Sequence, residues 1–202
     1  MPRRVTVIGI LLFLFFSCAS EAQAHLILQD SALFSGIVNS LIHIPSLLLL
    51  LAFGCRAGQH FNKHPPAQWT DMLWFLGPMA LGSFWGLTGL RNCSAGPVLA
   101  LASITGLLTT LDFNGNLFFL RIVSIVCGIG WGIYTAAEVQ LPFYKCFFFM
   151  SGSLITAGTI VFFLVLSITR IENRAVQLGV RIAGSWITAM TAMMLAYWAL
   201  FL

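Results

Sequence analysis

Six apolar stretches separated by short polar segments constrain this chain more than any other feature of its sequence. They lie at residues 32–54, 72–90, 96–111, 117–137, 144–168 and 182–202. A helix needs about 20 such residues to cross the roughly 30 Å hydrocarbon core of a bilayer. Of the 202 residues, 59% are hydrophobic and only 8% are charged, against a charged share of about 25% in soluble domains. The sequence therefore predicts an all-α fold, a polytopic membrane bundle of six transmembrane helices.

The N-terminus has the pattern of a secretory signal peptide. Arg3 and Arg4 precede an apolar run at 5–16, and Ala-Gln-Ala at 22–24 is a small-x-small cleavage site. The apolar run is too short to span a bilayer. We therefore expect residues 1–24 to be a cleaved signal peptide.

Cleavage at that site would make His25 the first residue of a single six-helix domain at 25–202. Two alternatives remain open at this point. Lipoprotein processing at Cys18 is one, although the bulky residues before it fit that pattern poorly. An uncleaved first anchor is the other.

Basic residues between the spans indicate the orientation. With the mature N-terminus outside, three segments would face the cytoplasm, namely 55–71, 112–116 and 169–181. These segments contain or border most of the cations, which are Arg56, Lys63, Arg121, Arg170, Arg174 and Arg181. The outer side would keep Arg91 and Lys145. This asymmetry follows the positive-inside rule and predicts a bacterial inner-membrane protein with both termini outside. The cations are too scattered to form a nucleic-acid footprint.

A polar stripe runs along the first predicted span. Gly36, Asn39, Ser40 and His43 are spaced i, i+3, i+4, i+7, which places them on one face of a helix. Polar groups at membrane depth are costly unless they face a bundle interior, a partner or a watery path. Pro45 removes a backbone donor and can loosen the helix one turn upstream. The stripe is a candidate transport pathway, although His43 could instead hydrogen-bond a neighbouring helix.

The other motifs are explained more simply by packing or by solvation. Glycines recur in two spans, and they are typical of close helix contacts in lipid; these are Gly82, Gly86 and Gly89, and then Gly128, Gly130 and Gly132. The cysteines after residue 24 have no zinc-site spacing and are expected to be small buried side chains. His60 and His64 precede a Pro-Pro pair, so we expect a solvated loop there.

The order of residues in the first span resembles that of the HupE/UreJ family. The likeness rests on Phe34-Ser35-Gly36-Ile37-Val38-Asn39-Ser40-Leu41 and on Ala52-Phe53-Gly54-Cys55-Arg56-Ala57-Gly58, and it extends more loosely to Pro78, Gly132 and Glu138. Members of that family are regarded as six-span nickel or cobalt permeases with a cleaved signal and a histidine at the mature N-terminus. The resemblance implies the same fold and a transport role.

The chain departs from the family at its metal-ligand positions. The family's first span follows Gly-x-x-His-Pro-x-x-x-x-Asp-His, whereas this chain has Asn39-Ser40 and Pro45-Ser46 in register with His-Pro and Asp-His. In the fourth span, Trp131 and Thr135 occupy the positions registered with histidines. Nickel and cobalt favour imidazole ligands. His25 and His43 remain as candidate metal ligands, with Glu138 facing the stripe.

The sequence thus predicts an inner-membrane permease of altered specificity, whose pathway candidates are Gly36, Asn39, Ser40, His43 and Glu138 and whose cargo is a divalent metal or a small solute. An accessory membrane subunit that has kept the scaffold without transport is the alternative. An enzyme is disfavoured because haem or quinone chemistry would need paired histidines inside spans. No resident cofactor is expected.

Overall fold

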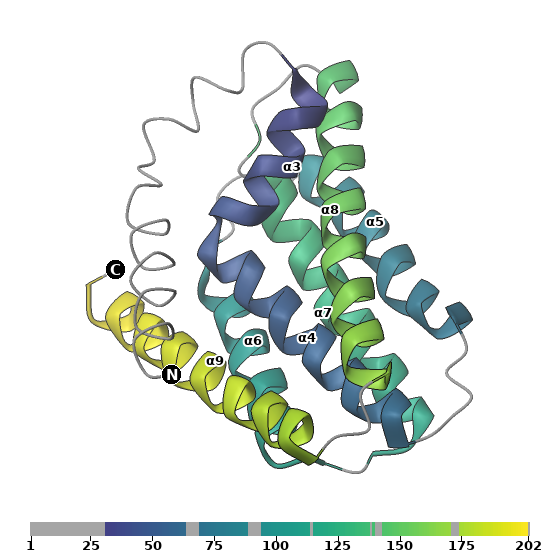
Figure 1. Ribbon diagram of the computed structural model, residues 1–202. Helices are drawn as coiled ribbons and strands as arrows, with labels where there is room; N and C mark the ends of the chain where they lie inside the picture. Colours follow the sequence, from purple (N-terminus) through teal and green to yellow (C-terminus); the bar gives the residue numbers. More distant parts are fainter. Residues whose placement is uncertain are drawn as a thin grey trace, which may run out of the picture.

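A computed structural model of the chain describes residues 31–63, 69–88, 94–113, 115–137, 139, 143–170 and 174–201. This part of the chain is helical throughout, apart from short connections. The α-helices are α3 (Ala32–Ile42), α4 (Ile44–Lys63), α5 (Leu73–Thr88), α6 (Gly96–Thr110), α7 (Leu117–Ala137), α8 (Phe143–Arg170) and α9 (Arg174–Phe201) (Figure 1). A short 3-10 helix, η1 (Trp69–Met72), precedes α5. The predicted all-α class is confirmed. The predicted signal peptide, His25 and Glu138 lie outside the described residues.

Three of these helices are long and apolar enough to cross a membrane, over Leu117–Ala137, Tyr144–Arg170 and Arg174–Leu200. The pair α3 and α4 would make a fourth span if it is counted as one bent segment. Helices α5 and α6 are apolar but shorter. The described part of the chain therefore has the helices of a membrane protein, while the predicted number of six spans stays a prediction.

The first predicted span is broken. Helices α3 and α4 meet at a bend of 73° at His43, which is visible in Figure 1. Helix α4 then continues to Lys63, so the predicted loop 55–71 is wrong over 55–63. Hydropathy ends this span too early because Arg56, Gln59 and His60 are polar, yet these side chains are buried among neighbouring helices. The predicted loop 169–181 is likewise helical from Arg174 onward.

Helix α4 is the centre of the bundle. It contacts α6, α7, α8 and α9, and the apolar core around it includes Leu49, Leu50, Met79 and Trp131. Phe53 of α4 stacks on Phe75 of α5 with 4.3 Å between ring centroids. The described cysteines, Cys55, Cys127 and Cys146, are buried, as expected for small core side chains.

Small residues set the distances between helices, as predicted. Gly82 and Gly86 of α5 lie against the backbone of α7, and Gly128 and Gly132 of α7 lie against the backbone of α5. Gly106 of α6 and Gly184 of α9 face each other in the same way. In lipid, close backbone approach of this kind supplies contact energy that the hydrophobic effect does not.

Helix α8 runs along the bundle and supports both parts of the broken segment (Figure 1). Its first half packs on α3, where Gly36 and Gly152 each lie against the backbone of the opposite helix. Its second half packs on α4, where Gly54 and Gly58 accept the side chains of Leu164 and Ile168. The bend is thus held by one continuous partner helix.

Candidate functional site: a broken helix and a polar end of the bundle

The break between α3 and α4 is built around the backbone of His43. This residue has φ −72° and ψ 99°, an extended conformation between two helices. Its N–H donates to the Asn39 carbonyl at 3.1 Å, which ends α3. Its own carbonyl accepts from the Leu47 N–H at 3.0 Å and from the Ser46 hydroxyl at 2.8 Å, which begins α4. Pro45 lies in the first turn of α4, where its missing N–H is tolerated.

Two residues of the predicted stripe face α8. Ser40 is fully buried, and its hydroxyl donates to the Gly36 carbonyl at 3.1 Å. The Ser153 hydroxyl of α8 donates to the same carbonyl at 3.0 Å. A Cβ atom at Gly36 would overlap the carbonyl group of Phe149. The structure therefore places Gly36 and Ser40 in a helix contact.

The other two residues of the stripe lie differently. Asn39 is half-buried at the end of α3, and its side-chain Nδ2 is buried without a hydrogen-bond partner among the described residues. His43 is also half-buried. His43 ends α3 with a helical φ of −72° and keeps the i to i−4 hydrogen bond to the Asn39 carbonyl, so it lies one turn after Asn39, and the bend begins at its ψ of 99°. Asn39 and His43 are therefore neighbours on the last turn of α3, where the break begins.

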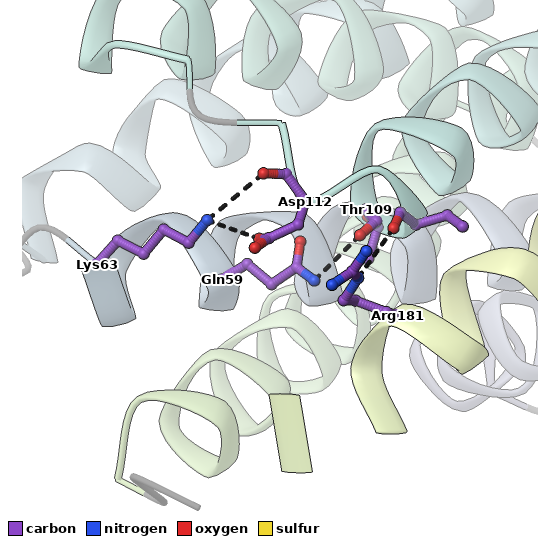
Figure 2. Close-up of polar contacts among 6 residues, drawn as sticks. Gln59, Lys63, Thr109, Asp112 and Arg181 are labelled. Atoms are coloured by element: carbon purple, nitrogen blue, oxygen red, sulfur yellow. Dashed lines mark hydrogen bonds and ion pairs between the residues drawn. The ribbon is translucent and has the colours of Figure 1, made fainter. Parts of the chain in front are cut away.

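A second polar cluster, which the sequence did not predict as a site, lies at the other end of α4. There, side chains of α4 and α9 bind the last carbonyls of α6 (Figure 2). Gln59 Nε2 donates to the Thr109 carbonyl at 3.1 Å, and Arg181 Nε donates to the Thr110 carbonyl at 3.1 Å. Lys63 Nζ pairs with the Asp112 carboxylate at 2.8 Å and with its carbonyl at 3.4 Å. Carbonyls at a helix C-terminus lack intrahelical donors and favour nearby cations, so these contacts complete α6.

The turn after α6 presents Asp112 to this cluster. Asp112 has φ 50°, in the left-handed region that aspartate tolerates better than most residues. The Asp112 N–H donates to the Thr109 carbonyl and the Phe113 N–H to the Leu108 carbonyl, both at 3.2 Å. This is the Schellman pattern that ends many helices. The segment at 112–116, which was predicted to separate two spans, thus begins in a tight turn with aspartate at the left-handed position.

Three further charged residues lie on other elements, namely Arg56 on α4, Asp71 on η1 and Arg121 on α7. Arg121 donates to Asp71 Oδ1 at 2.8 and 3.1 Å, and its guanidinium lies 5.4 Å from the centroid of the Trp74 ring. Arg56 is 1% exposed, and its Nε and Nη2 have no hydrogen-bond partner in the described part of the chain. A buried guanidinium without hydrogen bonds is costly, which makes Arg56 the main polar anomaly of the bundle.

A family model assigns the chain to a known family. The model described as "HupE / UreJ protein" matches residues 11–194. The chain belongs to the HupE/UreJ family. No curated protein and no solved structure matches it. Membership supports a nickel/cobalt transporter-like role at the level of the family, whose members are transporter-like membrane proteins and not enzymes.

In this HupE/UreJ protein, two of the positions placed in register with the family's ligands, Ser46 and Thr135, carry hydroxyls that donate to backbone carbonyls of the chain. Ser46 donates to His43, and the Thr135 hydroxyl donates to the Trp131 carbonyl at 2.9 Å. Trp131 is fully buried, and its Nε1 has no partner among the described residues. Within those residues, no group of three or more His, Cys, Asp or Glu side chains could hold a metal ion.

Proposed function

We propose that this HupE/UreJ protein is a permease of the bacterial inner membrane and that its solute path passes the break between α3 and α4. Asn39 and His43 would line the path there. Gly36 and Ser40 would hold α3 against α8 and keep the break in place. The orientation inferred from the basic residues, with both termini outside, belongs to the same proposal.

The observation that carries the proposal is the broken helix. Because Pro45 has no N–H, the carbonyl of Leu41 lacks its usual helical donor, and the bend of 73° separates the two hydrogen-bond ladders. Irregular backbone at membrane depth is tolerated where it lines a cavity or is buried in protein. In secondary transporters, discontinuous helices of this kind form the substrate site. Family membership supports the same role.

The family suggests nickel or cobalt as cargo, and the ligand chemistry of this chain suggests a change of specificity. His43 supplies one imidazole at the break. His25 and Glu138 would have to supply further ligands, and both lie outside the described residues. With amide, hydroxyl and indole groups at the registered positions, we propose a divalent metal held more weakly than in the family, or a small polar solute.

Uptake in cells tests the proposal directly. The full chain is expressed in cells that lack their own nickel and cobalt uptake, and accumulation of radiolabelled nickel, cobalt and a panel of small solutes is measured. Asn39→Leu and His43→Leu should each abolish the accumulation of the transported species, while the amount of protein in the membrane is unchanged. Thr159→Leu is the matched control, because Thr159 is exposed on α8 and does not belong to the broken helix. The proposed solute path is refuted if both variants accumulate the transported species to the same level as the unchanged chain.

An accessory membrane subunit is the second candidate, and one observation favours it. Gly36 and Ser40 are accounted for by the contact with α8, so half of the stripe needs no solute. Interhelical hydrogen bonds of this type contribute about 0.6 kcal/mol each on average. A stable partner that co-purifies with the chain, together with no uptake by the unchanged chain, would support this reading and contradict the permease.

A further inference from the structure

A cleft of about 270 Å³ opens at the polar end of the bundle, between the end of α4, the turn after α6, and the first turns of α9. We propose that this cleft binds a phosphate group. The phosphate could belong to an anionic phospholipid of the adjacent leaflet or to a soluble phosphate compound. The site is separate from the broken helix, because α4 has 20 residues and therefore separates the two by about 30 Å. The inference does not depend on the proposed transport function.

The charges of the cleft favour an anion. Three cations line it, namely Lys63, Arg174 and Arg181, and Asp112 is the single carboxylate among its lining residues. Lys63 and Asp112 are paired with each other at 2.8 Å, which leaves the guanidinium groups of Arg174 and Arg181 without a carboxylate among the described residues. The same charges would repel a divalent cation, so the cleft does not suit a metal ion.

The available donors match phosphate in kind. Arg181 uses Nε on the Thr110 carbonyl, and its remaining N–H groups are not used by α6. Arg174 has no hydrogen bond or ion pair within the described residues and begins the long helix α9. A guanidinium presents paired donors that fit two phosphate oxygens, and the N-terminus of a helix adds favourable partial charge. Asn62 and Gln177 contribute amide groups to the same walls.

One wall of the cleft is held by contacts within the protein before any ligand enters. Figure 2 shows Gln59, Lys63 and Arg181 converging on the end of α6, with each side chain held by a carbonyl or carboxylate there. Side chains that are already immobilised lose little further conformational entropy on binding. The contacts that complete α6 therefore also fix one side of the anion site.

The surroundings of the cleft favour a phospholipid over a soluble compound. Ile168 and Leu178 add apolar surface to the lining. Helix α9 packs mainly on α6 and hardly on α8, and its outward side below the cleft carries exposed apolar residues, including Leu178 and Ile182. A headgroup phosphate in the cleft would therefore have a lipid-facing surface beside it for its acyl chains. Basic residues at a membrane surface attract anionic lipids.

Lipid binding to the purified full chain tests the proposal. The protein is prepared in mild detergent and titrated with phosphatidylglycerol, or with phosphatidylcholine as the neutral probe, and bound lipid is counted by native mass spectrometry. We expect phosphatidylglycerol to bind more tightly than phosphatidylcholine. Arg174→Gln should weaken phosphatidylglycerol binding about fivefold, which corresponds to about 1 kcal/mol for one cation. Adding Arg181→Gln should weaken it further by a similar factor.

Arg170→Gln is the matched control, because Arg170 is an exposed cation at the end of α8 that does not line the cleft. It should leave phosphatidylglycerol binding unchanged. In a second arm, inorganic phosphate and glycerol phosphate are added as competitors and their stabilisation of the protein is measured by thermal unfolding. Stabilisation by these compounds that is lost in Arg174→Gln, without selective lipid binding, would assign the site to a soluble phosphate.

Equal loss of lipid binding in Arg170→Gln and Arg174→Gln would overturn the proposal, since it would indicate general surface attraction. Unchanged binding of both probes in Arg174→Gln would also overturn it. Arg181→Gln removes a contact that completes α6 and could disturb folding. Arg174→Gln alone is therefore enough to decide the test, because the Arg174 side chain makes no contact that completes α6.

Discussion

The contact between Gly36 of α3 and α8 can be tested by adding one methyl group. In Gly36→Ala, the new Cβ would overlap the Phe149 carbonyl, and the obstacle is backbone, which cannot rotate aside. Overpacking costs about 1–3 kcal/mol, and a backbone obstacle places this site at the upper end, near 3 kcal/mol. Alanine gains about 1 kcal/mol over glycine in helix propensity. The net expectation is a loss of about 2 kcal/mol in the free energy of unfolding, or a factor of about 30 in the folded-to-unfolded ratio.

The assay is reversible unfolding in mixed micelles of a mild detergent and sodium dodecyl sulfate, followed by far-UV circular dichroism. Gly179→Ala is the matched control, because a Cβ at Gly179 of α9 meets no atom within 4 Å. That variant should gain about 1 kcal/mol from propensity alone. The reasoning is refuted if Gly36→Ala is as stable as the unchanged chain, or more stable. Space for the methyl group would then indicate that Gly36 faces an open path and not a helix.

Two other substitutions probe the charged groups in the same unfolding assay. Asp71→Asn should cost about 1–2 kcal/mol, because a hydrogen bond to a charged group contributes about 1.5–3 kcal/mol and the Arg121 side chain is 37% exposed, which weakens the pair; a double-mutant cycle with Arg121→Gln that gives no coupling energy would contradict this. Arg56→Met should raise stability by about 1–4 kcal/mol, because it removes a buried guanidinium whose Nε and Nη2 have no partner among the described residues. A loss of stability in Arg56→Met would show instead that Arg56 is paired with an anion in the folded protein.

Much of the helical framework could be predicted because the apolar runs end at clear turn signals. Helix α7 occupies the predicted range 117–137, and α6 follows the short span bounded by Pro97 and Asp112. The ends of α4 and α9 could not be predicted by the same reasoning. The last turns of α4 and the first turns of α9 are polar, and hydropathy assigns polar residues to loops. Arg56 and Gln59 are helical because neighbouring helices bury them, which a local pattern does not reveal.

The candidate sites were predictable to different degrees. Pro45 gave a local signal for the broken helix, and the structure has its bend two residues earlier, at His43. The cleft at the other end had no such signal, because it joins residues far apart in the sequence, such as Gln59, Asp112 and Arg181. The only trace of it in the sequence was the excess of Lys and Arg in the segments predicted to face the cytoplasm. That excess indicated orientation and gave no reason to expect a formed cleft.

This chain keeps some positions of the HupE/UreJ pattern and replaces others, and the two groups of residues have different physical roles. Gly36, Gly54 and Gly58 are shared, and each lies so close to α8 that a side chain would meet its atoms. Asn39 and Trp131 replace expected ligands, and each has a buried nitrogen without a partner among the described residues. Steric constraints at the shared glycines preserve how the helices pack, whereas they place no limit on ligand chemistry. Family membership is therefore stronger evidence for the helix arrangement of this chain than for nickel or cobalt as its transported substrate.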